Sequence, residues 1–536
     1  MKSTMMDWPL TISRLFEHGR TVYGSSVVSS FQGETVRTAT FREIAERTEK
    51  LAAALKRLGI ADGDRVATFS WNHQEHLEAY LAVPSMGAVL HTLNIRLFPE
   101  QLVYIINHAA DRAIIVDDVL VPALAPLVPE LKNVEHFIVI GSDCDATALP
   151  GALSYEELLA AEDTGATWPD VDERSPAAMC YTSGTTGNPK GVVYSHRSVF
   201  LHSLMEIGGI SLTERDRILP VVPMFHANAW GLPHSGWLAG ADMLMPGRYL
   251  QPDPLCRMIA AERPTIAAAV PTIWNDILRH ADEHPADLSS LRMIVCGGAA
   301  VPRTLMERFG ERFGVDIIQA WGLTETGPLA ALSFPPKHVP EGERMDWRAK
   351  AGRTLAGVEL RITDDEGKEM PRDGESVGEI EVRGPWVTGA YHGEPTPEKF
   401  NEGWLRTGDV GAVDEAGYIR ISDRAKDVIK SGGEWISSVE LETLLTGHPD
   451  VVEAAVIGVP DDRWTERPLA CVVLREGAGA DPSALRDFLS DKVVKWWLPE
   501  RWTFIDAIPR TSVGKFDKKV LRAQHAEGEL TIEQID

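Results

Sequence analysis

The chain has 536 residues, 44% of them hydrophobic, so it exceeds the usual length of one domain and we expect at least two domains with large cores. Its 53 basic and 78 acidic residues give a net charge of −25, which argues against binding of nucleic acid or of an anionic membrane. Because the sequence shows neither a leader pattern near residue 1 nor an apolar run of about 18 residues, we expect a cytoplasmic protein without stable membrane insertion.

Helices and strands alternate through most of the chain. Residues 41–59 repeat apolar positions at helical spacing, as do residues 304–314. Buried strands are predicted at residues 64–71, 113–118, 136–141, 291–298 and 315–322. This alternation predicts an α/β fold of mostly parallel sheets covered by helices.

The pattern changes near residue 350 and again near residue 424. Residues 350–423 contain short strands and polar turns, which predicts an antiparallel β region like a small barrel. Residues 424–536 return to strands and helices and predict a small α+β domain. We therefore expect a large N-terminal domain over 1–423 and a small C-terminal domain over 424–536.

The five cysteines predict neither a disulfide framework nor a zinc site. No CxxC pair occurs, and four of the five lie in apolar runs typical of reduced, buried thiols. They are Cys144, Cys180, Cys256, Cys296 and Cys471.

The segment YTSGTTGNPKGV (Tyr181–Val192) predicts a phosphate-binding loop. Glycines let backbone N–H groups approach phosphate oxygens, hydroxyls add donors, and a lysine adds charge. An ordinary turn seldom combines so many donors with a lysine. The segment also lacks the GK[ST] ending of the common nucleotide P-loop, which disfavours NTPases and kinases. The predicted nucleotide ligands here are Thr182, Ser183, Gly184, Thr185, Thr186, Gly187 and Lys190.

TSGTTGNPKG resembles the signature loop of the adenylate-forming superfamily of acyl-CoA synthetases, luciferases and peptide-synthetase adenylation domains. The later family blocks follow in order as WGLTET (Trp321–Thr326), WLRTGD (Trp404–Asp409), DRAKDVIKSGGEW (Asp423–Trp435) and PRTSVGK (Pro509–Lys515). The segment VVPMFHANAWGLP is most similar to bacterial medium- and long-chain fatty acyl-CoA synthetases and methylmercaptopropionate-CoA ligases. The resemblance implies an ATP-dependent acyl-CoA synthetase, which forms acyl-AMP with release of pyrophosphate and then transfers the acyl group to coenzyme A.

The resemblance also implies the groups that handle charge in this reaction. A carboxylate is already a nucleophile, so the chemistry needs cations and oriented donors at the α-phosphate rather than a general base. Thr182 and Glu325 are expected to hold Mg²⁺, which prefers oxygen ligands. Lys515 is expected to bridge the carboxylate and the α-phosphate during adenylation, and His226 is placed with the catalytic residues.

The nucleotide end is assigned in the same way. Asp409 is expected to accept the ribose hydroxyls, and Arg424 to donate to the same sugar. Gly298 and Trp321 are expected at the adenine, beside Gly322 and Thr324. Many relatives carry tyrosine at the position of Trp321 and glycine at that of Ala320, so these two departures leave the details of base packing open.

The acyl group is expected beside the FHANAWG segment. The resemblance places His226, Trp230, Gly231, Gly297 and Gly298 around it, with Trp230 as a gate. The alternative is that the histidine and tryptophan belong to an apolar core helix. No evident cation is available for a second charge on the substrate, so we predict a medium- or long-chain fatty acid, with a short thioether or branched acid such as 3-methylmercaptopropionate as the alternative.

Domain motion and assembly are also implied by the resemblance. Lys426 matches a hinge, and Lys430, Trp435 and the glycines Gly432 and Gly433 would move against the site for the step with coenzyme A. Close relatives dimerise through the N-terminal domain, so a homodimer is expected.

Four rival functions deserve comparison. Gly374–Gly378 reads GESVG, the serine-hydrolase pattern, but a polar turn precedes it and a predicted strand follows it, where a nucleophile elbow needs a strand and then a helix. A non-catalytic nucleotide sensor is disfavoured by the presence of Thr182, Glu325 and Lys515. Oxidation of the adenylate, as in luciferases, stays open as an alternative because those enzymes share the same scaffold. A peptide-synthetase module is disfavoured, since the sequence shows no carrier domain.

Overall fold

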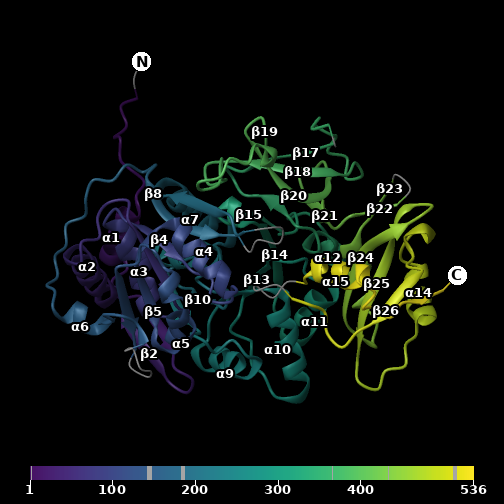
Figure 1. Cartoon of the computed structure of the whole chain (residues 1–536), viewed down its shortest axis with the longest axis horizontal. Coiled ribbons are helices and arrows are strands. Elements are labelled where there is room, and N and C mark those ends of the chain that lie inside the picture. The colour runs from purple at the N-terminus through teal and green to yellow at the C-terminus, as the bar shows by residue number, and fades with distance from the viewer. Residues whose placement is uncertain are drawn as a thin grey trace.

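The computed structural model describes residues 1, 3–141, 148–182, 188–364, 366–431, 434–510 and 516–535, with the backbone alone at 434 and 435. Figure 1 shows the N-terminal sheets, purple to teal, at the left and centre, and the C-terminal segment, yellow, at the right end.

A mostly parallel sheet near the N-terminus has the strand order β7-β6-β5-β3-β4-β8-β9. The strands are β3 Arg65–Phe69, β4 Val89–Thr92, β5 Asp111–Asp117, β6 His136–Ile140, β7 Leu153–Ser154, β8 Pro176–Tyr181 and β9 Gly191–Ser195. Only β9 runs antiparallel to its neighbour in this order, because the predicted phosphate loop reverses the chain between β8 and β9.

A second, larger sheet has the order β16-β15-β14-β13-β12-β10-β11-β1-β2. Its strands are β1 Val27–Phe31, β2 Val36–Thr40, β10 Arg217–Pro220, β11 Asp242–Met245, β12 Ile266–Ala269, β13 Met293–Gly297, β14 Ile317–Gly322, β15 Leu329–Leu332 and β16 Arg353–Thr354. In this spatial order, each pair of neighbouring strands between β14 and β1 is parallel. The pairs at the two edges, which involve β16, β15 and β2, are antiparallel.

Helices fill the space around and between these two sheets (Figure 1). They are α1 Ile12–Val22, α2 Phe41–Arg57, α3 Gln74–Ser85, α4 Pro99–Ala109, α5 Val121–Leu124, α6 Tyr155–Ala160, α7 His196–Ile210, α8 Leu232–Ala239, α9 Pro252–Glu262, α10 Pro271–Glu283, α11 Arg303–Phe313 and α12 Arg344–Arg348. Short 3₁₀ turns are η1 Asp118–Leu120, η2 Ala125–Glu130, η5 Thr324–Thr326, η6 Glu341–Glu343, η7 Pro397–Lys399 and η8 Lys495–Trp497. The short element η4 Ala227–Gly231 contains residues with left-handed φ and ψ. Every residue of α3 is buried, and one core joins α3 and α8 to strands of both sheets.

The predicted antiparallel region forms a separate sheet with the order β17-β18-β20-β19, in which β21 also pairs with β20. The strands are β17 Glu359–Thr363, β18 Gly378–Arg383, β19 Phe400–Asn401, β20 Trp404–Val413 and β21 Ile419–Arg424. The α/β fold class predicted from the alternation of elements is confirmed.

The C-terminal segment has its own sheet and core. The strands are β22 Ile429–Ser431, β23 Glu434–Ile436, β24 Val451–Asp461, β25 Thr465–Leu474, β26 Arg501–Phe504 and β27 Glu533–Gln534, and the helices are α13 Ser438–Leu445, α14 Pro482–Ser490 and α15 Lys518–Ala526. The chain leaves the preceding sheet at Arg424 and enters this one at Ile429, so Lys426 lies in the connection. The change of sheet supports the predicted domain limits, 1–423 and 424–536, and the predicted hinge at Lys426. Both stay predictions.

The buried thiols agree with their sequence context. Cys180, Cys256, Cys296 and Cys471 are free and buried, whereas Cys144 lies outside the described residues. Across the described part of the chain, no helix is long and apolar enough to cross a membrane.

Candidate active site

The two ends of the predicted phosphate loop meet where β8 ends and β9 begins. The backbone N–H of Thr182 donates to the carbonyl of Lys190 at 2.9 Å, and the N–H of Lys190 donates to the Thr182 hydroxyl oxygen at 3.1 Å. These two hydrogen bonds join Thr182 to Lys190. The predicted ligands Ser183, Gly184, Thr185, Thr186 and Gly187 lie outside the described residues.

Tyr391 connects this loop to Glu325. Its hydroxyl donates to Glu325 Oε1 at 2.7 Å, and the Nζ of Lys190 lies 5.1 Å from the centre of its ring. Burial, together with the Glu325 carboxylate, raises the pKa of Tyr391 far above its usual value, which keeps the hydroxyl a donor. Thr182, Lys190 and Glu325 are therefore brought into one neighbourhood.

The backbone on the other side of Glu325 is also fixed. The Tyr194 hydroxyl, on β9, donates to the carbonyl of Thr324 at 2.7 Å. The N–H of Thr388 donates to the carbonyl of Glu325 at 2.8 Å. Glu325 is thus held from two directions while its side chain stays half-buried beside the loop.

The donor set near Glu325 fits Mg²⁺. The described residues include no group of three or more His, Cys, Asp and Glu side chains that could hold a metal ion. Mg²⁺ is usually held by one or two protein oxygens and by substrate phosphates, so a carboxylate and a hydroxyl suffice. Glu325 and Thr182 supply those two groups, and their role as ligands remains a prediction.

The predicted ribose and adenine residues converge on Asp409. Its Oδ1 pairs with Arg424 Nε at 2.7 Å, and its Oδ2 accepts from the indole N–H of Trp321 at 2.8 Å. Asp409 and Arg424 are register partners on β20 and β21, whereas Trp321 comes from β14. The structure brings these three residues together, across two sheets, although 88 positions separate Trp321 from Asp409.

Two of the predicted glycines are required by the packing of the backbone. A Cβ on Gly322 would lie 2.0 Å from the carbonyl oxygen of Pro328, and a Cβ on Gly297 would lie 2.6 Å from that of Ala320. Any side chain at either position would push β13, β14 or β15 apart. A direct role for these glycines in binding remains a prediction.

The FHANAWG segment forms a left-handed turn. Ala227, Asn228, Ala229 and Trp230 have φ between 43° and 59°, and Gly231 follows with φ 92°. Such a run costs energy for residues other than glycine and is found where the surrounding structure holds it for a purpose. The helix of the alternative interpretation is not found, because α8 begins only at Leu232, but Trp230 does belong to the hydrophobic core.

The turn brings part of the predicted acyl site together. Trp230 is buried, and its Cζ2 lies 3.9 Å from the place a Cβ on Gly298 would take. Gly298 itself has φ 81°, a conformation that favours glycine. The Cys180 thiol donates to Asn228 Oδ1 at 3.0 Å and anchors the turn from β8, while His226 is half-buried at its start.

The C-terminal residues are only partly described. Lys430 is exposed on β22, where its backbone N–H donates to Glu466 Oε2 at 2.9 Å, and burial lowers the pKa of Lys426. Lys515, Gly432 and Gly433 lie outside the described residues, as does the side chain of Trp435.

Two family models match this chain. The model for the AMP-binding enzyme covers residues 17–392, and that for the AMP-binding enzyme C-terminal domain covers residues 440–515. The chain belongs to the AMP-binding enzyme family. The resemblance inferred from the TSGTTGNPKG loop and the later blocks is therefore confirmed.

The similarity to known members extends over nearly the whole chain. A long-chain-fatty-acid–CoA ligase of Thermus thermophilus is 46% identical over 98% of this chain and 97% of its own length. A 3-methylmercaptopropionyl-CoA ligase of Ruegeria pomeroyi is 44% identical over 98% of this chain and 99% of its own. The crystal structure of the anthranilate CoA ligase AuaEII in complex with anthranoyl-AMP superposes with a TM-score of 0.88 at 27% identity, covering 99% of this chain and all of the other.

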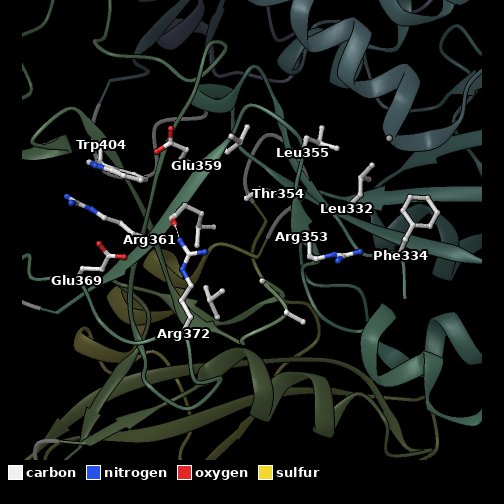
Figure 2. Close-up of a pocket in the computed structure, with 16 residues that line it drawn as sticks. Leu332, Phe334, Arg353, Thr354, Leu355, Glu359, Arg361, Glu369, Arg372 and Trp404 are labelled. Carbon is white, nitrogen blue, oxygen red and sulfur yellow. Dashed lines mark hydrogen bonds between the residues drawn. The ribbon is translucent and has the colours of Figure 1, made fainter. Parts of the chain in front are cut away.

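A cavity of about 770 Å³ lies apart from these residues, between the β17–β20 sheet and the β15–β16 edge. Figure 2 shows Trp404, Arg361 and Glu369 along one side of it and Leu332 and Phe334 along the other. Arg361 in its wall is already engaged, since it pairs with Glu381 at 2.7 Å and lies 4.7 Å from the Trp404 ring centre. No predicted site residue lines this cavity, so we do not assign it to the active site.

The serine-hydrolase alternative also finds no support in the geometry. Ser376 lies in an exposed turn before β18, and its hydroxyl donates to Asp373 at 2.7 Å. A strand follows it rather than a helix, so the GESVG segment is not a nucleophile elbow.

Sequence reasoning missed Tyr391 and Tyr194. Tyr391 lies in the glycine-rich segment GAYHG, where a tyrosine between turn residues was the only available signal. Tyr194 occupies an ordinary position in a strand, and nothing in the sequence distinguishes it. Both contribute through hydroxyl groups that hold the backbone or the side chain of the Thr324–Glu325 pair.

Proposed function

We propose that this chain activates an aliphatic carboxylic acid as its adenylate, with release of pyrophosphate, and transfers the acyl group to coenzyme A. The activity class, an AMP-forming acid–thiol ligase that uses ATP, Mg²⁺ and coenzyme A, is that of the curated relatives and is confirmed. The observation that carries the proposal is the cluster in which Tyr391 joins Glu325 to Lys190 at the base of the phosphate loop.

The chain's own residues would divide the work by charge. Lys190 and the loop donors would bind the phosphates of ATP, and the Asp409 carboxylate, held by Trp321 and Arg424, would receive the ribose. Mg²⁺, held by Glu325 and Thr182, would supply positive charge that offsets the phosphate oxygens. Lys515 would orient the carboxylate toward the α-phosphate, so adenylation depends on positioning rather than on a base.

Two acid classes are candidates for the substrate. A medium- or long-chain fatty acid is supported by the 46% identity to a long-chain-fatty-acid–CoA ligase. A short thioether acid is supported by the 44% identity to a 3-methylmercaptopropionyl-CoA ligase. We propose that Trp230, buried against Gly298 at the left-handed turn, gates the acyl pocket in either case.

The proposal is tested by product analysis. Pyrophosphate should appear only when ATP, Mg²⁺ and an acid are all present, and mass spectrometry should find acyl-CoA when coenzyme A is added. Nucleotide binding without acid-dependent pyrophosphate would indicate a sensor instead. An oxidised acid in place of the thioester would indicate chemistry of the luciferase kind.

A kcat/KM series over straight-chain acids of about two to eighteen carbons measures the length of the acyl pocket. Each buried methylene contributes about 0.8 kcal/mol, so the value should rise about fourfold per carbon at most until the pocket ends. A Trp230→Ala variant should extend the series toward longer acids.

Assembly and location are further parts of the proposal. We propose a homodimer formed by the N-terminal domain, in the cytoplasm. Light scattering should return twice the chain mass of 58.9 kDa. A mass equal to one chain at every concentration would contradict the dimer.

A further inference from the structure

Two side chains of α4 reach the base of the predicted phosphate loop. Tyr104 and His108 lie one helical turn apart on this helix, and their rings stack with the centres 5.2 Å apart. The Nδ1 of His108 lies 2.7 Å from the hydroxyl oxygen of Tyr181, so a hydrogen bond joins the two side chains. Tyr181 is the last residue of β8 and directly precedes Thr182, which is bonded to Lys190 across the loop.

The ring of Tyr181 is packed closely on its other sides. Its centre lies 5.1 Å from that of the buried His91 ring, and a Cβ on Gly191 would lie 3.0 Å from its Cζ. Gly191 is also the partner of Tyr181 in the register of β8 and β9. Burial raises the pKa of Tyr181 far above its usual value, so the hydroxyl group keeps its proton. A movement of this ring would therefore be passed to both strands that carry the loop.

The same face of α4 also holds the segment 391–394. The hydroxyl of Tyr104 donates to Glu394 Oε1 at 3.3 Å. The ring of His108 meets that of His392 edge-on, with the centres 5.2 Å apart. A Cβ on Gly393 would lie 3.1 Å from the Nε2 of His108, so the helix and this segment are in close contact.

The segment 391–394 is joined in turn to the loop and to Glu325. The backbone N–H of His392 donates to the carbonyl of Gly191 at 2.8 Å, and the Tyr391 hydroxyl donates to Glu325 Oε1 at 2.7 Å. Lys190 lies against the ring of Tyr391. The α4 side chains therefore contact two separate supports of the predicted phosphate site.

We propose that Tyr104 and His108 are positioning residues for adenylation, which act through Tyr181 and the segment 391–394 to hold the phosphate loop and Glu325 in the relative position that binds the phosphates of ATP. The inference rests on the proposed function. Catalysis that depends on positioning is sensitive to small displacements, since a misplacement of about 1 Å can lower a rate about a hundredfold.

A purely structural role predicts a different result. If these contacts only stabilised the fold, their loss would lower the melting temperature and leave the kinetic constants of the folded enzyme unchanged. A positioning role instead raises KM for ATP. Thioester formation from supplied acyl-adenylate should be unaffected, because that compound carries no β- or γ-phosphate for the loop to bind.

Acid-dependent release of pyrophosphate tests the role of His108. His108→Ala should raise KM for ATP about fivefold, the effect of losing one hydrogen bond, while KM for the acid stays within about twofold of the wild type. His108→Asn keeps an amide near the position of Nδ1 and should restore KM for ATP to within about twofold. His136→Ala is the matched control, because the half-buried His136 on β6 of the same sheet also makes one hydrogen bond, to the carbonyl of Leu58, and it should change neither constant.

Double-mutant cycles show whether the α4 side chains act through the named partners. Tyr181→Phe should raise KM for ATP about as much as His108→Ala, and the double variant should be no worse than either single change, because both remove the same bond. Tyr104→Phe should raise KM for ATP about threefold, with the same lack of additivity when it is combined with Glu394→Ala.

The outcomes separate this inference from the proposed function. Absence of acid-dependent pyrophosphate from the folded wild type would overturn the proposed function and the inference with it. With an active wild type, folded His108→Ala and Tyr104→Phe variants that keep the wild-type KM for ATP would overturn the inference alone, and so would additive losses in the cycle of His108 and Tyr181. If Tyr181→Phe does not fold, the comparison of His108→Ala with His108→Asn decides, since equal KM values for ATP in these two variants would also contradict the inference.

Discussion

Trp321 and Asp409 are joined across two sheets, by an indole N–H that donates to the carboxylate at 2.8 Å. The other carboxylate oxygen pairs with Arg424 at 2.7 Å. Asp409 is only 4% exposed, so both partners are needed to hold a buried charge in place. We therefore predict that Trp321 positions Asp409 in the expected nucleotide site, besides the stacking expected from the sequence.

Replacing Trp321 by phenylalanine should weaken the use of ATP. The variant keeps an aromatic ring but removes one donor to a charged group, worth about 1.5–3 kcal/mol, so we expect kcat/KM for ATP to fall at least tenfold. Steady-state kinetics with saturating acid measures this.

Trp386→Phe is the matched control for that variant. Trp386 is also a buried tryptophan, but its indole N–H donates to the Leu329 carbonyl. We expect a lower melting temperature with little change in KM for ATP. Equal losses in ATP use for both variants would show that the Trp321–Asp409 contact has no special role.

The two half-reactions should depend on different lysines. Lys515→Ala should abolish adenylation yet leave thioester formation from supplied acyl-adenylate largely intact, because its ammonium is expected at the α-phosphate. Lys430→Ala should show the opposite pattern, because Lys430 is expected to face the site only for the second step. Pyrophosphate release and thioester formation are assayed separately, and parallel losses in a folded variant would contradict the assigned role.

Much of the fold could be predicted because its signals are local. Apolar runs ending in glycine, such as LRMIVCGG, give the buried parallel strand β13, and helical spacing gives α2 and α11. The motif blocks identified Asp409, Trp321 and Glu325 one by one. Their mutual contacts depend on the pairing of distant strands, which local periodicity does not encode.

Other features had no usable signal in the sequence. Alanine and tryptophan rarely adopt positive φ, so nothing in ANAW predicted the left-handed turn before Gly231. A glutamate between Met205 and Ile207 in an amphipathic helix indicates a solvent-facing position, whereas Glu206 lies in the core. Tertiary packing decided both, and Glu206 packs directly against Gly231 at the end of that turn.

The buried pair of Lys518 and Glu442 should stabilise the C-terminal segment next to the hinge. Lys518 Nζ lies 2.6 Å from the Glu442 carboxylate and also donates to the Ser438 hydroxyl at the start of α13. Lys518→Met would leave Glu442 buried without its cation, which typically costs about 3–5 kcal/mol.

Hydrogen exchange measures that loss locally. Amides of α13 and β24 should exchange faster in Lys518→Met, and adding Glu442→Gln should restore part of the protection by removing the unpaired charge. Lys519→Met, at the exposed neighbouring position, is the control and should have little effect. Unchanged protection in Lys518→Met would show that the pair contributes nothing to stability.

Glu206 should make the stability of the protein fall as the pH rises. Its pKa is raised by burial from about 4.5 to about 8, so between these values the folded state holds a proton that the unfolded state has released. Its contribution is complete below pH 4.5 and is lost as the pH rises through 8, at up to about 1.4 kcal/mol per pH unit. His202 and His234, which face the same region from α7 and α8, stay neutral across this range.

A Glu206→Gln variant tests this pH dependence because its side chain has no proton to lose in this range. Its melting temperature relative to that of the wild type should therefore rise between pH 5.5 and pH 7.5. Calorimetry of the two proteins in matched buffers measures the difference, in which the other titrating groups cancel. A difference that stays constant with pH would mean that the carboxyl group is already ionised in the folded state.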